Sequence, residues 1–413
     1  MAVRIGVPRE RATGETRVAT VPAVAEKFAA LGAEVLLERG AGALSHVRDE
    51  EYTTVTLVDD PAEVFAADVV LKVDPPTPAE VGLMSRGTVL IGLLQPYTAT
   101  ESVAALRDGG ITGLALELLP RTTRAQSMDA LTSQASIAGY KAGLMAASLA
   151  GRYYPMLMTP AGTLRPAKVV VLGVGVAGLQ AIAMARRLGA MVEAYDVRAV
   201  TAEQVQSLGA RFIDTGIDAE VEGGYARELT DEEKAKAKEI VDSHIIAADA
   251  VITTAAVPGR PSPKLVTADV VEKMRSGAVI VDMAAEGGGN CELTRPGEQY
   301  QAPNGVIVYG PLNIPAMLPI HASDQYARNL MYFLTPFIVD GELELDWEDE
   351  ILAGSVLTRD GAIVNQTIKE RIEGPSAPTP AAEAEAASRP AVEKDDGEDA
   401  ADGSARPDEG GAS

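Results

Sequence analysis

One stretch, residues 168–196, constrains the fold of this chain more than any other. It begins with the apolar, β-branched run Val169–Leu172, which is typical of a buried parallel strand. Glycines then follow at G-x-G-x-x-G spacing, and the apolar pattern lengthens to a helical period. A second strand, Met191–Tyr195, ends in Asp196. The stretch therefore predicts a β–α–β unit with a tight glycine turn.

Each part of this unit has a physical role in binding a dinucleotide. Gly173 permits the turn, Gly175 lets the backbone approach a pyrophosphate, and Gly178 lets the helix pack on the strand. The helix N-terminus offers N–H groups to phosphates. Asp196 accepts hydrogen bonds from ribose hydroxyls and repels a 2′-phosphate, which favours NAD(H) over NADP(H). A glycine-rich turn in another kind of α/β protein is the alternative. The predicted cofactor-binding residues here are Gly173, Gly175, Val176, Ala177, Gly178, Asp196, Val197 and Arg198.

Composition narrows the class of protein and of partner. A chain of 413 residues is long enough for two or three domains. Its net charge of −23 argues against nucleic acid as a partner, because phosphate backbones require basic surfaces. The single cysteine, Cys291, allows no intrachain disulfide and favours the reducing cytosol. We expect no secretory signal, no membrane-spanning segment and no metal site.

Residues 1–132 alternate strand-like and helix-like segments. Helices are predicted at Pro22–Leu31 and Glu101–Asp108. Strands are predicted at Val3–Val7, Ala33–Leu37, Asp68–Val73, Thr88–Leu94 and Ile111–Leu118. This alternation predicts a parallel sheet with helices on both faces. Because the segment has no glycine fingerprint, we expect a Rossmann-like domain without a phosphate site.

A second domain, which contains the glycine turn, is predicted over residues 133–311. Its connecting helix is predicted at Ser133–Arg152, with Thr132 and Ser133 as N-cap candidates. Residues 216–230 are polar and predict a mobile surface loop, followed by a helix over Thr230–Val241 that Thr230 caps. Its later strands are predicted at Ala210–Asp214, Ala250–Thr254, Ala278–Asp282 and Val306–Val308.

The rest of the chain divides into a returning segment and a tail. An amphipathic helix over Leu318–Phe337 and a β-hairpin over Asp349–Asn365 extend the first domain, predicted as 1–132 plus about 312–373. Residues 374–413 contain no aromatic, Ile or Leu residue and carry −7 of the net charge, which predicts a disordered acidic tail. The predicted fold class is α/β, with two Rossmann-like, doubly wound parallel-sheet domains and a cleft between them.

A dense polar segment, Pro120–Asp129, follows the last predicted strand of the first domain. Ligands of open parallel sheets bind beyond the carboxyl ends of the strands. Arg121 and Asp129 are candidates for an ion pair near a nicotinamide, and Gln126 is a candidate donor to a carboxamide. A surface turn with an incidental salt bridge explains the same residues equally well.

Several segments resemble the soluble NAD(H)-binding α subunit, or domain I, of proton-translocating nicotinamide nucleotide transhydrogenase. The resemblance covers residues 1–373, and the pairing of RAQSMD with GGYA is specific to that family. It is carried by RAQSMD at 124–129, SQASIAGYKA at 133–142, LGVGVAGLQAIAMARRLGA at 172–190, EGGYARE at 222–228, AEGGGNCELT at 285–294 and LTRDGAIV at 357–364.

Alanine dehydrogenases are wider relatives, which share IGVPRE at 5–10, RVA at 17–19 and LKV at 71–73. In those enzymes the lysine of LKV and a histidine act on the amino acid. Lys72 is present here, but the histidine position is Gln95 and a later aspartate position is Glu286. Because an amide does not transfer the proton that oxidative deamination requires, the alanine dehydrogenase reaction loses its acid–base group.

The transhydrogenase resemblance implies direct hydride transfer from NADH, bound here, to NADP⁺ on a separate domain, by positioning and water exclusion. It implies that the nicotinamide end, and hence catalysis, involves Arg121, Gln126, Asp129 and Thr132. Tyr225 is expected on a loop that closes over the cofactor, with an exposed loop aromatic as the alternative. Ala256 and Gly287 are the remaining predicted cofactor contacts, with ordinary structural turns as the alternative.

The resemblance also implies partners. Membrane-spanning and NADP(H)-binding transhydrogenase subunits would hold this chain at the inner, cytoplasmic face of the cell membrane, and the chain is expected to form a homodimer. Two other functions remain open: an alanine dehydrogenase-type NAD-dependent oxidoreductase, and a non-catalytic NADH-binding regulatory subunit.

Overall fold

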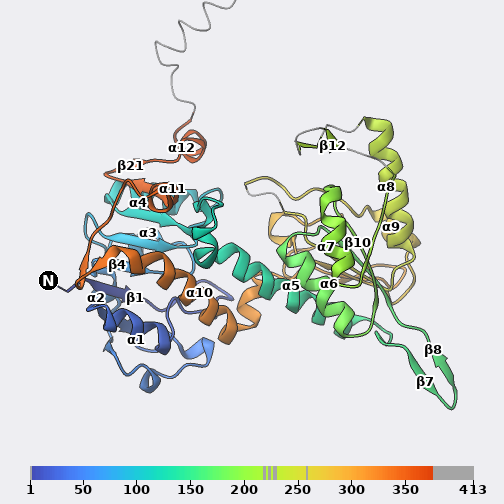
Figure 1. The fold of residues 1–413 in the computed structure, drawn as a ribbon, viewed down its shortest axis with the longest axis horizontal. Coiled ribbons are helices and arrows are strands. Elements are labelled where there is room, and N and C mark those ends of the chain that lie inside the picture. Colours follow the sequence, from blue (N-terminus) through green and yellow to red (C-terminus); the bar gives the residue numbers. More distant parts are fainter. Residues whose placement is uncertain (1, 217–219, 222–224, 227–229, 257–258, 375–413) are drawn as a thin grey trace, which may run out of the picture. The chain divides into compact units, whose positions relative to one another are not determined.

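The structure of the protein, a computed structural model, describes residues 2–216, 220–221, 225–226, 230–256 and 259–374. Within them the chain forms two large, mainly parallel β-sheets, and helices flank each sheet (Figure 1). This architecture confirms the predicted α/β class with two doubly wound sheets.

The first sheet is built from residues that lie far apart in the sequence. Its strand order is β21-β20-β6-β5-β4-β1-β2-β3. The parallel strands are β1 (Arg4–Val7), β2 (Glu34–Glu38), β3 (Val55–Val58), β4 (Val69–Leu71), β5 (Val89–Gly92) and β6 (Thr112–Ala115). An antiparallel edge is added by β20 (Val356–Arg359) and β21 (Ala362–Ile363). The order 3-2-1-4-5-6 is that of a Rossmann sheet, and it reverses between β1 and β4.

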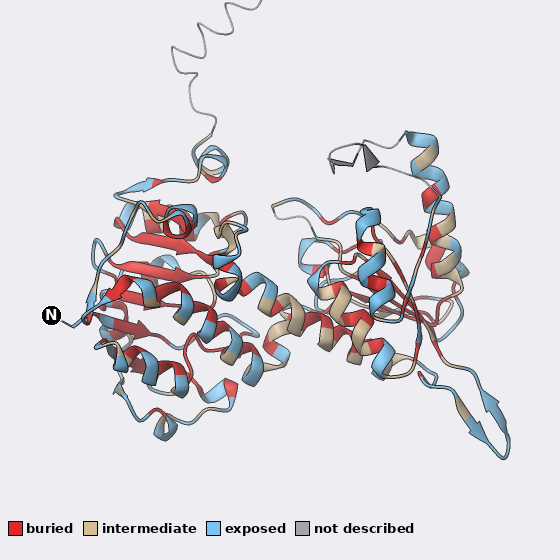
Figure 2. Cartoon of the chain, viewed as in Figure 1, coloured by how far each residue is buried: buried red, intermediate tan, exposed pale blue. Residues whose placement is uncertain are grey.

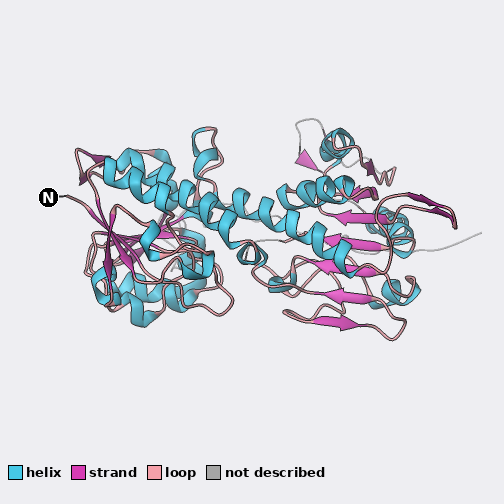
Figure 3. Cartoon of the chain, turned by 90° about the horizontal axis from the view of Figure 1, so that it is seen from below, coloured by secondary structure: helices cyan, strands magenta, loops and turns pink. Residues whose placement is uncertain are grey.

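The second sheet repeats this order with a different set of strands, which Figure 3 shows side by side. Its strand order is β11-β10-β9-β14-β15-β17-β16. The parallel strands are β9 (Lys168–Leu172), β10 (Met191–Tyr195), β11 (Arg211–Phe212), β14 (Ala250–Thr253), β15 (Val279–Asp282) and β17 (Ile307–Tyr309). β16 (Gln299–Gln301) pairs antiparallel with β17 at the edge. The order reverses between β9 and β14, directly beside the glycine turn.

The central strands of both sheets are buried on both faces, as the red strands in Figure 2 show. Consecutive strand residues point to opposite faces and therefore join different cores. In β4, Val69 and Leu71 belong to one cluster and Val70 to another. In β9, Val169 and Val170 separate in the same way. Continuous apolar runs such as VVVL at 169–172 are the sequence signature of this double burial.

Helices supply the other side of each core. On the first sheet, α1 (Pro22–Ala30), α10 (Pro319–Leu334) and α11 (Glu350–Ser355) contribute to one core, and α2 (Pro61–Phe65), α3 (Pro78–Val81), α4 (Thr100–Gly109) and α12 (Gln366–Glu373) to the other. On the second sheet, α5 (Ala130–Leu149), α6 (Val176–Arg187) and α7 (Ala202–Ser207) contribute to one core, and α8 (Asp231–Ile246) and α9 (Ala268–Lys273) to the other.

The predicted N-cap of the connecting helix was wrong. α5 begins at Ala130, and its N-cap is Asp129 instead of Thr132 or Ser133. Asp129 Oδ1 accepts a hydrogen bond from the Thr132 N–H at 2.9 Å. Asp and Thr are both good N-cap residues, and here the Asp129 carboxylate caps the helix, which begins three residues before its predicted start at Ser133.

Several short elements were missed or misassigned. The predicted hairpin Asp349–Asn365 begins instead with α11, because Asp349 Oδ1 accepts hydrogen bonds from the Ile351 and Leu352 N–H groups as an N-cap. Only β20 and β21 form the hairpin. The missed strands β3, β16 and the pair β7 (Leu157–Thr159) and β8 (Gly162–Leu164) lie at sheet edges or form a separate hairpin, where exposed residues interrupt the apolar pattern. Smaller antiparallel pairs are β12 (Glu220–Val221) with β13 (Tyr225–Ala226), and β18 (Ile338–Val339) with β19 (Glu342–Leu343).

Two predicted segments fall largely or wholly outside the described residues. In the loop predicted at 216–230, the strands β12 and β13 are described and residues 217–219, 222–224 and 227–229 are not. The tail is described only as far as Gly374. The capping of α8 by Thr230 is confirmed, since Thr230 Oγ1 accepts from the Glu233 N–H. No helix in the described part of the chain combines the length and apolarity needed to cross a bilayer.

Candidate dinucleotide site

The glycine turn after β9 is shaped by its own neighbours. Gly173 has a φ of +93°, and a Cβ at this position would lie 2.5 Å from Thr254 Oγ1. A Cβ at Gly178 would lie 2.0 Å from the carbonyl oxygen of Gly173. Gly173 therefore makes the turn, and Gly178 lets α6 pack against the end of β9.

Gly175 differs from these two glycines because the place of its missing side chain is open space. A Cβ there would meet no atom within 4 Å, and Gly175 is the N-cap of the 12-residue helix α6. The N–H groups of the first turn, from Val176, Ala177 and Gly178, have no acceptor within the helix. Backbone donors and the positive end of the helix dipole thus border open space beside Gly175, which is the arrangement in which helix N-termini bind phosphates.

Asp196, directly after β10, is a nearly buried carboxylate with four hydrogen bonds. Its Oδ2 accepts from the Val174 N–H at 2.7 Å and from Arg198 Nη2 at 3.0 Å. Its Oδ1 accepts from the Arg198 N–H and Nε, both at 2.9 Å. Burial would raise the pKa of Asp196, but the hydrogen bonds from Arg198 and Val174 outweigh it and lower the pKa. A charged carboxylate therefore braces the glycine turn, while the next residue, Val197, is 74% exposed.

Helix α5 connects the glycine turn to the polar loop. Gly139 lies so close to α6 that a Cβ there would be 2.1 Å from the carbonyl oxygen of Ala177. Ten residues earlier, about 15 Å along the helix axis, Asp129 caps α5. Asp129 Oδ2 also accepts from Thr132 Oγ1 at 2.6 Å, so these two predicted residues are in contact. One helix thus carries the Asp129–Thr132 pair at its start and packs beside the glycine turn at its middle.

The other predicted residues of the polar loop are arranged differently. Both Asp129 oxygens bind Thr132, and Asp129 forms no ion pair with Arg121 among the described residues. Arg124 pairs instead with Asp349, the N-cap of α11, at 2.6 Å. Arg121 and Gln126 are exposed. The hypothesis of an Arg121–Asp129 pair was therefore wrong, because helix capping engages the carboxylate.

The loops after β14 and β15 are joined by a residue that the sequence reasoning missed. Asn290 is fully buried; its Oδ1 accepts from the Ala255 N–H at 3.0 Å, and its Nδ2 donates to the Ala255 and Pro263 carbonyls at 2.7 and 2.8 Å. The next residue after Ala255, Ala256, is exposed. A Cβ at Gly287 would lie 2.4 Å from Ser262 Oγ, so this glycine accommodates a neighbouring loop of the protein. The sequence feature that could have indicated this role is the position of Asn290, an amide residue inside a glycine-rich turn that follows a strand.

Comparisons with known proteins identify the family of the chain. Residues 6–138 match the model described as alanine dehydrogenase/PNT, N-terminal domain, and residues 142–366 match the corresponding C-terminal domain. The chain belongs to the alanine dehydrogenase/PNT family. The boundary between the two family domains falls inside α5.

Within the alanine dehydrogenase/PNT family, transhydrogenase relatives are the more similar ones. The chain is 45% identical over 380 residues to a protein of Rhodospirillum rubrum named as the first part of the NAD(P) transhydrogenase α subunit, covering 89% of this chain and 99% of that protein. A crystal structure of transhydrogenase from Sinorhizobium meliloti matches with a TM-score of 0.79 and 43% identity, covering 87% of this chain and 100% of that one. The alanine dehydrogenase of Bacillus subtilis is 31% identical, covering 76% of this chain and 80% of that protein.

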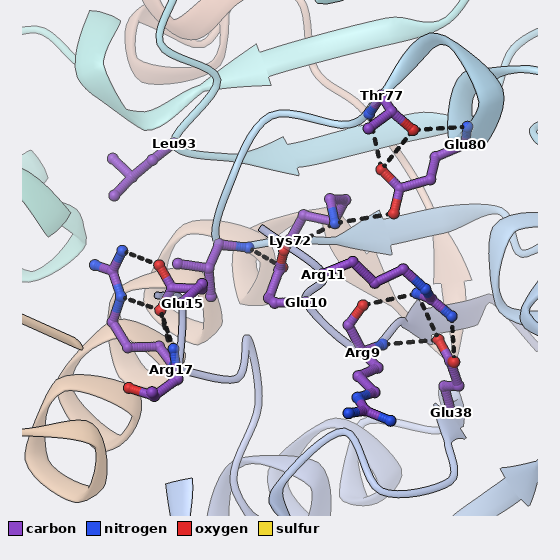
Figure 4. Close-up of polar contacts among 12 residues, drawn as sticks. Arg9, Glu10, Arg11, Glu15, Arg17, Glu38, Lys72, Thr77, Glu80 and Leu93 are labelled. Atoms are coloured by element: carbon purple, nitrogen blue, oxygen red, sulfur yellow. Dashed lines mark hydrogen bonds and ion pairs between the residues drawn. The ribbon is translucent and has the colours of Figure 1, made fainter. Parts of the chain in front are cut away.

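The reversal point of the first sheet contains ion pairs where the second sheet has its glycine turn (Figure 4). Lys72, which is 2% exposed, donates from Nζ to Glu10 Oε2 at 2.9 Å and lies 3.6 Å from Glu80 Oε1. Arg17 and Glu15, also buried, form an ion pair at 2.6 Å. Burial would lower the pKa of Lys72, but the two glutamates outweigh it and raise the pKa. The lysine shared with alanine dehydrogenases is therefore a charged, already paired cation.

The other two positions that distinguish alanine dehydrogenases are also engaged in structural contacts. Gln95, after β5, has a φ of +45°, and its N–H donates to Glu117 Oε1 at 2.7 Å. Glu286 Oε1 accepts from the Asn313 N–H at 2.7 Å, and Asn313 Nδ2 donates to Glu15 at 2.9 Å. These contacts do not replace the acid–base group that the histidine position would supply.

Tyr225 is the one predicted site residue whose side chain lies outside the described part of the structure. Its backbone belongs to β13, which pairs with β12.

Proposed function

We propose that this chain binds NAD(H) and positions its nicotinamide for direct hydride exchange with NADP(H) held by a partner subunit. The observation that carries this proposal is the arrangement around α6: an open-sided Gly175, free N–H groups at the helix start, and a charged carboxylate at the end of the next strand. The high identity to transhydrogenase α subunits supports the same function.

The residues that would hold the cofactor follow from their positions. The N–H groups of Val176, Ala177 and Gly178 would bind the pyrophosphate, as helix N-termini bind phosphates in general. Asp196 would accept the adenosine ribose hydroxyls, with Val197 and Arg198 beside it. Ala256 and Gly287 are in the loops after β14 and β15, which Asn290 joins, and they would border the second ribose.

The nicotinamide end would be formed by the start of α5 and the loop before it. The Asp129–Thr132 pair fixes a carboxylate and a hydroxyl at the first turn of α5, and the exposed Gln126 and Arg121 are available for ring amide contacts. Tyr225 would close over the bound cofactor. NADH supplies the hydride, so the task of these side chains is to hold the ring and exclude water.

Partners complete the proposal. NADP(H) would be bound by another subunit, and proton translocation would take place in membrane-spanning subunits that hold this chain at the cytoplasmic face. A homodimer is supported by the β7–β8 hairpin and the residue before it, which leave large apolar side chains exposed: Met156 at 59%, Met158 at 79% and Leu164 at 42%.

The alternative of an alanine dehydrogenase-type activity has one favourable observation, the presence of Lys72. The ion pairs of Lys72 with Glu10 and Glu80, and the amide at Gln95, oppose it. A non-catalytic NADH-binding regulatory subunit would need the same cofactor contacts without hydride transfer, and the identity to transhydrogenases favours the catalytic function.

Three measurements on the full chain separate these functions. Titration with NADH, followed by protein or cofactor fluorescence, is expected to show binding. Addition of an NADP(H)-binding transhydrogenase subunit is expected to start hydride transfer between NADH and an NADP⁺ analogue, which a regulatory subunit would not do. L-Alanine with NAD⁺ is expected to yield no NADH; NADH formation there, or failure to bind NADH, would contradict the proposal.

A further inference from the structure

Arg198 supplies three of the four hydrogen bonds that Asp196 accepts. Two come from its guanidinium, from Nε to Oδ1 at 2.9 Å and from Nη2 to Oδ2 at 3.0 Å, and one from its own N–H. The Val174 N–H completes the set. A carboxylate offers about four acceptor positions, so the Asp196 carboxylate is saturated by its own protein.

Ribose hydroxyls can therefore reach Asp196 only by replacing donors that are already bound. The Val174 N–H and the Arg198 N–H belong to the backbone of the glycine turn and of the segment after β10. The guanidinium is the removable partner, because the Arg198 side chain is 56% exposed and the Asp196 side chain 7% exposed. Two ribose hydroxyls would thus take the two places of the guanidinium.

The guanidinium also has the chemistry of a phosphate receptor. Its planar fork donates two parallel hydrogen bonds to a carboxylate here and fits the oxygens of a phosphate in the same way. The fork is hydrogen-bonded to the Asp196 carboxylate, and the ribose hydroxyls would bind the same carboxylate. The carboxylate therefore acts on cofactor choice in two ways: its charge repels a 2′-phosphate, and it engages the cation that would otherwise attract one.

We propose that Arg198 is a specificity-determining residue: paired with Asp196 it is withheld from a 2′-phosphate, and once that carboxylate is neutralised it binds the 2′-phosphate of NADP(H). This inference rests on the proposed NAD(H) function of the same site. It assigns the discrimination between the two cofactors to the Asp196–Arg198 pair as a unit, and not to repulsion by Asp196 alone.

The test compares NADH and NADPH binding by the full chain, its Asp196→Asn variant and the double variant Asp196→Asn/Arg198→Ala. Asn keeps the shape and one acceptor oxygen for the Val174 N–H. We expect Asp196→Asn to bind NADPH about 10- to 100-fold more tightly than the original chain, as for one charge-assisted contact, and to bind NADH more weakly. The double variant is expected to lose this gain for NADPH.

Arg187→Ala is the matched control, because it removes an exposed arginine from the far end of α6, and it should change neither affinity. An equal gain for NADPH in the double variant would show that relief of repulsion suffices, and no gain in Asp196→Asn would also overturn the inference. Asp196→Ser, tested with the same ligands, replaces Asp196→Asn if thermal unfolding shows that the latter is not folded. If the original chain binds no NADH, the proposed function fails, which is a separate outcome.

Discussion

Acids outnumber bases among the buried groups at the reversal point of the first sheet. Asp74, three residues after β4, lies near the carboxylates of Glu15 and Glu10 and forms no hydrogen bond in the described part of the structure. Burial, with the charges of Glu15 and Glu10, raises the pKa of Asp74 to about 7. The cluster consists of the acids Glu10, Glu15, Asp74 and Glu80 and the bases Arg17 and Lys72. A proton held on Asp74 near neutral pH reduces the excess of negative charge.

This raised pKa predicts a pH-dependent stability. The folded chain retains a proton on Asp74 that the unfolded chain releases near pH 3.8, so this residue makes the protein less stable as the pH rises from about 4 to about 7. Asp74→Asn should therefore stabilise the protein more at about pH 8 than at about pH 5. Urea unfolding at the two pH values measures the difference, with Asp269→Asn, on the exposed side of α9, as the control. Equal effects at both pH values would refute the prediction.

The glycines of the turn give a second prediction at this scale. Gly178→Ala would place a Cβ 2.0 Å from the Gly173 carbonyl oxygen and should lower the free energy of unfolding by about 1–3 kcal/mol. Gly175→Ala meets no protein atom within 4 Å and should cost less than about 1 kcal/mol, while it weakens NADH binding by intruding on the pyrophosphate. Chemical denaturation and NADH titration separate the two effects. The reverse pattern would contradict these roles.

At the scale of elements, the sequence predicted the parallel strands well and the edges poorly. Runs such as Val169–Leu172 are apolar because both faces are covered, and that condition is visible locally. The edge strands β3 and β16 depend on pairing that leaves residues exposed, and the hairpin β7–β8 is exposed on both faces. In the site, the glycine turn and Asp196 follow from spacing. The role of Asn290 and the saturation of Asp196 by Arg198 do not, because they depend on how separate loops meet.

The β7–β8 hairpin gives a prediction at this scale. An exposed, methionine-bearing hairpin is a candidate for contact with a second copy of the chain. Met158→Asp should therefore shift the protein from dimer to monomer, because burying a carboxylate in an apolar contact is unfavourable. Light scattering coupled to size-exclusion chromatography measures this shift. Met191→Asp, at a 59% exposed position on β10, is the control and should leave the oligomeric state unchanged. A dimer that persists in Met158→Asp would place the interface elsewhere.

At the scale of the whole molecule, two sheets with the same strand order have different reversal points. The second has backbone donors beside Gly175, where no protein atom lies within 4 Å of the missing Cβ, whereas the first has buried ion pairs of Glu10 with Lys72 and of Glu15 with Arg17. Strand order alone therefore does not specify binding; the side chains at the carboxyl ends of the strands do. The acidic composition of residues 374–413 adds charge without the apolar residues of a core.

The composition of these last residues predicts the effect of truncation. A chain that ends at Gly374 should bind NADH with unchanged affinity and unfold at the same urea concentration, because every residue assigned to the cofactor and to the apolar cores precedes that point. Fluorescence titration and urea unfolding of the two chains measure both quantities. A loss of NADH affinity on truncation would show that the tail contributes to the site.

The pairing of β20 with β6 has a consequence for biosynthesis. The edge of β6 stays uncovered until a partner about 240 residues further along the chain has been made. At a ribosomal rate of about 5–20 residues per second this interval lasts roughly 10–50 s. The strands of the second sheet, by contrast, lie within 168–309 and are complete before β20 exists. The strands of the second sheet can therefore pair before the first sheet is complete. During this interval β6 is an unpaired edge strand, and chaperones would protect it from aggregation.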